Sequence, residues 1–342
     1  MKTNFTFLAG LVLIGLLGIA SLATSAKWEK KADMPTPRWA LSTSAVNGKI
    51  YAFGGAASGW LPAGYPPKVE VYDPATDTWE KKADMPNPRA WFSTSVVNER
   101  IYVIGGSTFP IPLLMLEEYN PATDTWTRKA DMPAPRSELS TSVVNGKIYA
   151  IGGATENSIF PNVFEYDPAT DTWTKKVDMP APRAGPSTCV VNGKIYAIGG
   201  KTVVVSWQGL RSVFEYDPVT DTWTRKADMP TSRVHLSTGV INEKIYAIGG
   251  VLLGPGPLST VEIYDPQTDT WTKGVDMPTG RTDISANVVN GKIYVVGGAT
   301  GFPQFALSTV EEYTPEGWKP DAFSVSPQGK VAKTWGEIKR SK

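Results

Sequence analysis

A nine-residue stretch recurs six times in this chain of 342 residues, and its spacing constrains the fold more than any other feature. It reads NGKIYAFGG at 47–55 and returns with small changes at 98–106, 145–153, 192–200, 242–250 and 290–298. A Trp lies 26 residues before the first Gly of each Gly-Gly pair, whereas the distance from that Gly to the next Trp varies between 21 and 25 residues. One structural unit is therefore repeated six times, and its length varies in a single segment.

Each unit of 47 to 51 residues has the pattern of four short β-strands. Runs such as STSAVNG and KIYAFGG are joined by Asn-Gly, which favours a tight hairpin because its turn needs positive φ. A third run, VEVYDP, follows the variable segment, and a fourth begins at the Trp after an Asp-Pro turn. Four strands at this period are typical of a propeller blade, and blades form a ring because each covers its neighbour. We predict an all-β, six-bladed propeller.

The repeat resembles the Kelch family over residues 28 to about 318. The resemblance is carried by the Gly-Gly pairs and by Tyr and Trp residues seven apart, at Tyr72/Trp79, Tyr119/Trp126, Tyr166/Trp173, Tyr216/Trp223 and Tyr264/Trp271. It implies a Kelch-type propeller with four antiparallel strands in each blade. We interpret the repeated Tyr and Trp as core and not as a cofactor site.

The two ends of the repeat predict how the ring closes. WEKKADMP at Trp28 matches the fourth strand completely, whereas Tyr313 and Trp318 are only five residues apart. We expect residues 28–34 to finish the sixth blade beside strands from 284–313. The expected domains are a signal peptide at 1–26, a propeller at 27–315 closed by its N-terminal strand, and a C-terminal tail at 316–342.

The first 26 residues have the pattern of a cleavable signal peptide, with Lys2, an uncharged apolar run from Phe5 to Ala20, and small residues before Lys27. The apolar run is short for a membrane span. We therefore expect a secreted or periplasmic protein, cleaved near Ala26, without a membrane span after signal removal, and monomeric.

Composition argues against several kinds of site. A net charge of +1 gives no reason to expect nucleic acid. His235 is the only His and Cys189 the only Cys, so we expect no imidazole-based metal site, no disulfide within the chain and no cofactor. We interpret Cys189 as small core filling.

The predicted ring has two different ends. The Asn-Gly hairpins and Asp-Pro turns form one polar, uniform end, here called the turn face. The other end, the loop face, carries the variable segments after Gly-Gly and the entries into the innermost strands, and is where function is expected. The variable segments are apolar and aromatic, which indicates either loops that roof the channel or an exposed binding surface. Their candidate ligand-binding residues are Trp60, Tyr65, Phe109, Phe160, Trp207, Arg211, Phe302 and Phe305.

A second set of candidates follows the six repeated Arg residues. Two residues after each Arg the sequence reads Ala40, Trp91, Glu138, Gly185, His235 and Asp283. In Kelch domains that bind peptides, the corresponding strand entries carry the contacts. This resemblance makes ligand-binding candidates of Trp39, Trp91, Ser137, Glu138, His235 and Asp283. We expect the Arg residues to be structural because they repeat, and both carboxylates to be solvated at the channel mouth.

Two functions remain open at this point. The first is a secreted binding module that presents its loop face to a protein, a peptide or a glycan, without catalysis. The alternative is a sugar-active enzyme resembling N-acetylneuraminate epimerase (mutarotase), an exported Kelch-type propeller. In that case Glu138 and Asp283 would be the catalytic candidates, and Arg would hold the substrate carboxylate. A closed pocket that joins Glu138 to an unpaired Arg would favour the enzyme, and an open apolar rim would favour a macromolecular partner.

Overall fold

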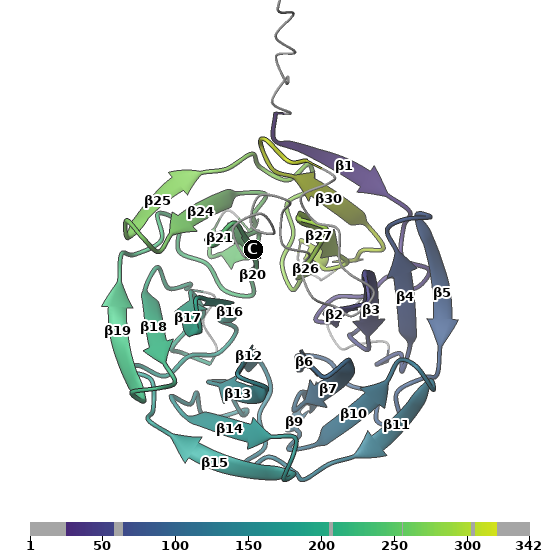
Figure 1. The fold of residues 1–342 in the computed structure, drawn as a ribbon, viewed down its shortest axis with the longest axis vertical. Coiled ribbons are helices and arrows are strands. Elements are labelled where there is room, and N and C mark those ends of the chain that lie inside the picture. Colours follow the sequence, from purple (N-terminus) through teal and green to yellow (C-terminus); the bar gives the residue numbers. More distant parts are fainter. Residues whose placement is uncertain (1–24, 58–63, 205–207, 255, 302–304, 320–342) are drawn as a thin grey trace, which may run out of the picture.

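In a computed structural model, which describes residues 25–57, 64–204, 208–254, 256–301 and 305–319, the chain forms a ring of β-sheets (Figure 1). Among these residues there are six antiparallel sheets of four strands each. The predicted six-bladed propeller is therefore confirmed.

The strands run from the channel to the outer edge in chain order, except that the outermost strand of the sixth blade is the first of the chain. Blades one to three are β2 (Ser42–Val46), β3 (Lys49–Phe53), β4 (Val69–Asp73), β5 (Thr78–Lys82); β6 (Ser93–Val97), β7 (Arg100–Ile104), β10 (Leu116–Asn120), β11 (Thr125–Arg128); and β12 (Ser140–Val144), β13 (Lys147–Ile151), β14 (Val163–Asp167), β15 (Thr172–Lys176). Blades four to six are β16 (Ser187–Val191), β17 (Lys194–Ile198), β18 (Val213–Asp217), β19 (Thr222–Lys226); β20 (Ser237–Ile241), β21 (Lys244–Ile248), β24 (Val261–Asp265), β25 (Thr270–Lys273); and β26 (Ser285–Val289), β27 (Lys292–Val296), β30 (Val310–Thr314), β1 (Lys27–Lys31).

Three of the variable segments contain small hairpins of their own. They are β8 (Ser107–Thr108) with β9 (Ile111–Pro112), β22 (Val251–Leu252) with β23 (Gly256–Pro257), and β28 (Ala299–Thr300) with β29 (Phe305–Ala306). Each follows a Gly-Gly pair, so all three lie on the loop face. The sequence did not predict these hairpins, because two-residue strands between Pro and Gly have no readable period.

The repeated Tyr and Trp are core residues that join neighbouring blades. Tyr72 is fully buried and stacks on Trp79 with 5.2 Å between ring centroids. The Trp79 indole donates to the carbonyl of Ala32, which precedes this blade, at 2.9 Å. Asp77 accepts hydrogen bonds from the Tyr72 hydroxyl at 2.6 Å and from the Ala32 amide at 2.8 Å. Each Tyr–Trp–Asp set therefore fixes its own blade to the strand before it.

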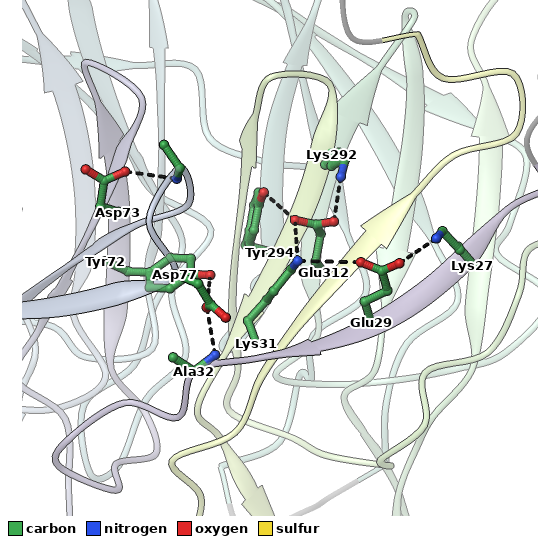
Figure 2. A network of polar contacts seen from close by, with 11 residues as sticks. Lys27, Glu29, Lys31, Ala32, Tyr72, Asp73, Asp77, Lys292, Tyr294 and Glu312 are labelled. Carbon is green, nitrogen blue, oxygen red and sulfur yellow. Dashed lines mark hydrogen bonds and ion pairs between the residues drawn. The ribbon is translucent and has the colours of Figure 1, made fainter.

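The ring is closed by β1, as the sequence predicted. Strand β1 pairs with β30 from Lys27↔Thr314 to Lys31↔Val310, and Trp28 packs on Tyr313 at 5.1 Å. Figure 2 shows the polar contacts beside this seam, where Glu312 accepts from Tyr294 at 2.5 Å and pairs with Lys292 and Lys31. Trp318 instead lies on the turn face, where its indole donates to the Asn290 carbonyl at 2.8 Å.

The channel wall is joined by a belt of hydroxyl groups. A Ser at the start of an innermost strand bonds a Thr in the innermost strand of an adjacent blade, so these repeated hydroxyl residues belong to the contact between blades. These pairs are Ser42–Thr94, Ser93–Thr141, Ser140–Thr188, Ser187–Thr238 and Ser285–Thr43, at 2.8 to 2.9 Å. Cys189 is part of this wall and packs with the core, as predicted. The described part of the chain holds no helix that is long and apolar enough to span a membrane.

Candidate functional site

The six repeated arginines are structural. Arg38, Arg89, Arg136, Arg183, Arg233 and Arg281 are all fully buried. In four of the six blades the guanidinium pairs with a buried carboxylate, as Arg38 does with Glu70 at 2.8 Å. Arg136 and Arg183 instead lie over the rings of Phe164 and Phe214, at 4.9 and 4.6 Å. Because their side chains are enclosed, these six residues cannot hold the carboxylate of a substrate.

Each arginine also joins two blades through its backbone. The Arg38 guanidinium donates to the Gly54 carbonyl of its own blade at 2.8 Å, whereas the Arg38 carbonyl accepts from the Gly298 amide of the sixth blade at 3.0 Å. A Cβ on Gly297 would lie 2.6 Å from the same carbonyl, so this approach requires glycine. The Gly-Gly pair and the arginine are therefore two halves of one contact between blades.

Two residues beyond each arginine, the backbone forms a closed ring of hydrogen bonds around the channel mouth. Each amide donates to the carbonyl at the equivalent position of the preceding blade, at 2.8 to 3.2 Å. All six residues have φ between 51 and 60°, the left-handed region, which is uncommon for residues other than glycine. The members of this mouth ring are Ala40, Trp91, Glu138, Gly185, His235 and Asp283.

Three side chains of the mouth ring form one charged network. His235 lies between two carboxylates, with Nε2 3.0 Å from Glu138 Oε2 and Nδ1 2.9 Å from Asp283 Oδ1. The Lys201 ammonium is 3.1 Å from the same Glu138 oxygen. The network joins blades three, four, five and six, and three of its four side chains are almost fully buried.

The expectation that both carboxylates are solvated at the channel mouth is wrong for Asp283, whereas Glu138 keeps partial contact with solvent. The side chain of Asp283 is 2% exposed and that of Glu138 is 19% exposed. Burial acts to lower the pKa of His235, but the charges of Asp283 and Glu138 outweigh it and raise this pKa to about 9. Burial acts to raise the pKa of Glu138, but its contacts with His235 and Lys201 lower it to about 2. At neutral pH His235 is therefore a cation bound to two carboxylates.

Two residues that the sequence reasoning did not select complete the network. A Cβ on Gly185 would lie 2.2 Å from the His235 ring, so only glycine at this position lets the imidazole reach Glu138. Lys201 belongs to a variable segment, and its backbone pairs with Ala184, which brings its ammonium under the mouth ring. Gly185 could have been noticed as the one glycine among the six ring positions. Lys201 carried no signal in the sequence.

The other half of the mouth is apolar and aromatic. Trp91 is half-buried and meets the buried Trp39 edge to face, with 5.0 Å between ring centroids and 83° between the planes. The Trp39 indole donates to the Ala57 carbonyl at 2.9 Å, which fixes both rings. Within the mouth is a cavity of about 100 Å³ lined by the mouth ring and by the residue that follows each ring position.

Exposed apolar residues of the variable segments, here called the apolar rim, lie on the same face of the ring as this cavity. Phe109 and Ile111 of the first small hairpin are 58 and 62% exposed, Leu253 of the second is 65% exposed and Phe305 of the third is 57% exposed. Val203, in the variable segment of the fourth blade, is 54% exposed. Some of the apolar loop residues are therefore exposed to solvent.

The remaining candidate residues have different surroundings. Tyr65 accepts a hydrogen bond from the Phe109 amide at 2.8 Å and so joins two neighbouring loops. Phe160 is half-buried over the Arg136 guanidinium at 5.2 Å, and Ser137 pairs through its backbone with Ala154. Arg211 is exposed and donates to the Met229 carbonyl at 2.8 Å. The candidates Trp60, Trp207 and Phe302 lie outside the described residues.

Among the residues that the structure describes, no group of three or more His, Cys, Asp or Glu side chains is arranged so that it could hold a metal ion. Cys189 is half-buried in the channel wall, and its removal from solvent raises the pKa of its thiol to about 12. A thiol with this pKa is protonated at neutral pH and is a poor nucleophile.

Comparison with known families agrees with this architecture. A model of the KLHDC2/KLHL20/DRC7 Kelch-repeats domain matches residues 82–250, and a Kelch motif model matches residues 40–86, 232–278 and 280–319. The chain belongs to the Kelch-repeat family.

Similar proteins share part of this chain or its fold. Kelch-like protein 15 of Danio rerio is 39% identical over 83 residues, which is 23% of this chain and 14% of that protein. Kelch repeat and BTB domain-containing protein 12 of Homo sapiens is 34% identical over 88 residues, with the same shares. The chain therefore matches about one seventh of the length of these relatives. The solved structure entitled "Structure of YjhT" has a TM-score of 0.68 at 18% identity, and the match covers 82% of this chain and 96% of that one. This last similarity shows the fold.

Proposed function

We propose that this protein is an exported binding module whose loop face recognises a segment of another protein. A Kelch β-propeller is a fold that suggests protein binding. The observation that carries the proposal is the exposed apolar rim on the face that also holds a small cavity. Phe109, Ile111, Leu253 and Phe305 lose solvent contact when a partner covers them, and residues of this kind are the usual anchors of protein interfaces.

The dimensions of the cavity support a protein segment over a free sugar. Sites that enclose a small molecule usually have volumes of about 300–1,000 Å³. The cavity in the channel mouth has about 100 Å³, enough for one side chain of a partner that rests on the rim. Export, proposed from the first 26 residues, would place this partner outside the cytoplasm or on the protein's own cell surface.

The chemistry of the mouth gives the sugar-enzyme alternative little support. Glu138 has a pKa of about 2, so it is ionised at neutral pH and is not a proton donor. Asp283 lies behind His235 with its side chain 2% exposed. The six repeated arginines are enclosed and cannot clamp a substrate carboxylate.

An array of peptides and glycans, incubated with the propeller, tests the proposal. We expect binding to a subset of peptides. In the triple variant Phe109→Ser, Leu253→Ser and Phe305→Ser this binding should weaken at least tenfold, because three exposed anchors are lost. The matched control is Val219→Ser, since Val219 is 86% exposed in an Asp-Pro turn on the turn face. Binding to glycans alone, or loss of binding only in the Val219 variant, would contradict the proposal.

A further inference from the structure

Glu138 is the most exposed member of the charged network in the channel mouth. The Glu138 side chain is 19% exposed, whereas those of Lys201, His235 and Asp283 are 6, 7 and 2% exposed. The two cations therefore lie beneath the surface, and the carboxylate is the charged group that a ligand meets first. A ligand that carries an anion would have to pass this carboxylate to reach Lys201 or His235.

The Glu138 carboxylate is held in place before any ligand arrives. Its Oε2 atom is 3.0 Å from His235 Nε2 and 3.1 Å from Lys201 Nζ. Its Oε1 atom has a longer contact of 3.4 Å with Lys201. Because a carboxylate oxygen accepts more than one hydrogen bond, Oε1 can still receive a strong donor. A fixed acceptor of this kind loses little conformational entropy on binding.

An aromatic residue lines the same cavity as this carboxylate. Trp91 is the preceding member of the mouth ring, and its carbonyl accepts from the Glu138 amide at 2.8 Å. Trp39 holds the Trp91 ring edge to face, and both Trp91 and Glu138 line the cavity. An aromatic ring and a fixed carboxylate in one cavity match a cation on an apolar stem, because the ring attracts the charge and the stem covers the ring.

We propose that the channel mouth binds one Arg or Lys side chain of the partner, with its cationic head on Glu138 and its stem against Trp91. The cavity of about 100 Å³ has room for a single side chain of this size. This inference rests on the proposed function and adds the chemical class of the residue at the centre of the interface. The apolar rim then contacts the residues on either side of that cation.

The direct test is an NMR titration of the ¹⁵N-labelled propeller with four small probes. N-acetyl-arginine amide and N-acetyl-lysine amide carry the cation, N-acetyl-citrulline amide is a neutral match for arginine, and N-acetyl-glutamate amide carries an anion. We expect the cationic probes to shift the Trp91 indole and the Glu138 amide resonances. The citrulline probe should bind at least tenfold more weakly than the arginine probe, and the glutamate probe should leave these resonances in place.

Three variants assign this binding to the mouth. Glu138→Gln removes the charge and should weaken arginine binding at least tenfold. Trp91→Asn removes the aromatic ring, leaves the charged network in place and tolerates the left-handed φ of 52° at this position. It should weaken arginine binding severalfold. If Glu138→Gln disturbs the fold, this variant still tests whether arginine binds at the mouth. Glu156→Gln is the matched control, since Glu156 is an exposed acid of the third blade's variable segment.

The inference is overturned if no cationic probe shifts the mouth resonances, if the glutamate probe binds as well as arginine, or if Trp91→Asn and Glu138→Gln both bind arginine like the wild type. Peptide binding that depends on the rim but not on a cation would remove this inference and leave the proposed function standing. If the propeller binds neither the peptides nor the cationic probes, both this inference and the proposed function are wrong.

Discussion

At the scale of single residues, the mouth ring keeps one backbone geometry at all six positions although its side chains differ. Five of its members, Ala40, Trp91, Glu138, His235 and Asp283, have positive φ without being glycine. Such a conformation costs about 1–2 kcal/mol per residue, and here the closed ring of backbone hydrogen bonds stabilises it. Because the backbone geometry does not depend on the side chain, these positions can vary in sequence without changing the fold.

The contact between His235 and Glu138 depends on the glycine between them. In Gly185→Ala the new Cβ would displace the imidazole, which it would meet at 2.2 Å. We expect the unfolding free energy to fall by about 2–4 kcal/mol, because the broken ion pairs and the strain both destabilise the fold. The pKa of His235, measured by NMR, should also fall. Gly193→Ala is the matched control, because Gly193 has a φ of +75° and nothing within 4 Å of an added Cβ. If both variants lose the same unfolding free energy, the loss comes from backbone strain and not from the broken contact between His235 and Glu138.

The stability of the network depends on pH in a defined direction. The pKa of His235 is raised from 6.5 to about 9, so its stabilising contribution is complete below pH 6.5 and is lost as pH rises through 9. The pKa of Glu138 is lowered from 4.5 to about 2, so its contribution is present above pH 4.5 and is lost as pH falls through 2. The network therefore stabilises the fold most between pH 4.5 and 6.5.

Thermal unfolding from pH 6 to 10 checks this assignment. The wild-type Tm should fall across this range, whereas His235→Asn should have a lower Tm at pH 6 and a flatter profile. Asn suits the left-handed φ of 55° at this position. Parallel profiles for the two proteins would mean that His235 does not carry the pH dependence.

Sequence position was enough to select Glu138, His235 and Asp283, because the repeat aligns them two residues after the arginines. It was not enough to show that they contact one another. That contact depends on the reach of side chains across three blades and on the absence of a side chain at Gly185. Lys201 was missed for a related reason, since a variable segment has no repeat against which a functional residue stands out.

At the scale of elements, the propeller depends on contacts that recur at every seam. Hydroxyl pairs such as Ser42–Thr94 join the innermost strands, and the arginine carbonyls join the Gly-Gly pairs to the next blade. The strands and the closure were predictable because each follows from a fixed spacing. The three small hairpins of the loop face were not, since the residues that form them occur only once.

The closing seam gives a prediction about two tryptophans. Trp28 is half-buried, stacks on Tyr313 and donates to the Val275 carbonyl at 2.8 Å. Trp28→Ala should lower the unfolding free energy by about 2–4 kcal/mol. Trp318→Ala should cost less than about 1.5 kcal/mol, because Trp318 lies outside the strand ladder, where its indole donates to the Asn290 carbonyl and contacts the Lys292 ammonium. Denaturant unfolding of both variants measures the difference, and the opposite order would contradict closure by β1.

At the scale of the whole molecule, the two faces of the ring have different roles. The turn face repeats the same polar turns from blade to blade, whereas the loop face combines an exposed apolar rim with a charged and aromatic mouth. The sequence predicted which face varies. It could not distinguish Phe109, which is 58% exposed, from Phe160, which covers Arg136, because both are aromatic residues beside Pro in variable segments.

Export is a prediction about the whole chain. If residues 1–26 are a signal peptide, the intact mass of protein recovered from its native host should correspond to a chain that begins near Lys27. A mass that includes Met1, in protein retained in the cytoplasm, would contradict export. The fold would be unaffected, since β1 begins at Lys27.

The central claim is that the loop face is where a partner binds, and hydrogen–deuterium exchange tests it most directly. The propeller is measured alone and with the tightest-binding peptide from the array. We expect slower exchange in residues 107–112, 251–257 and 299–306, with the Asn-Gly and Asp-Pro turns unchanged. Slower exchange confined to the turn face, with these three segments unchanged, would contradict this claim.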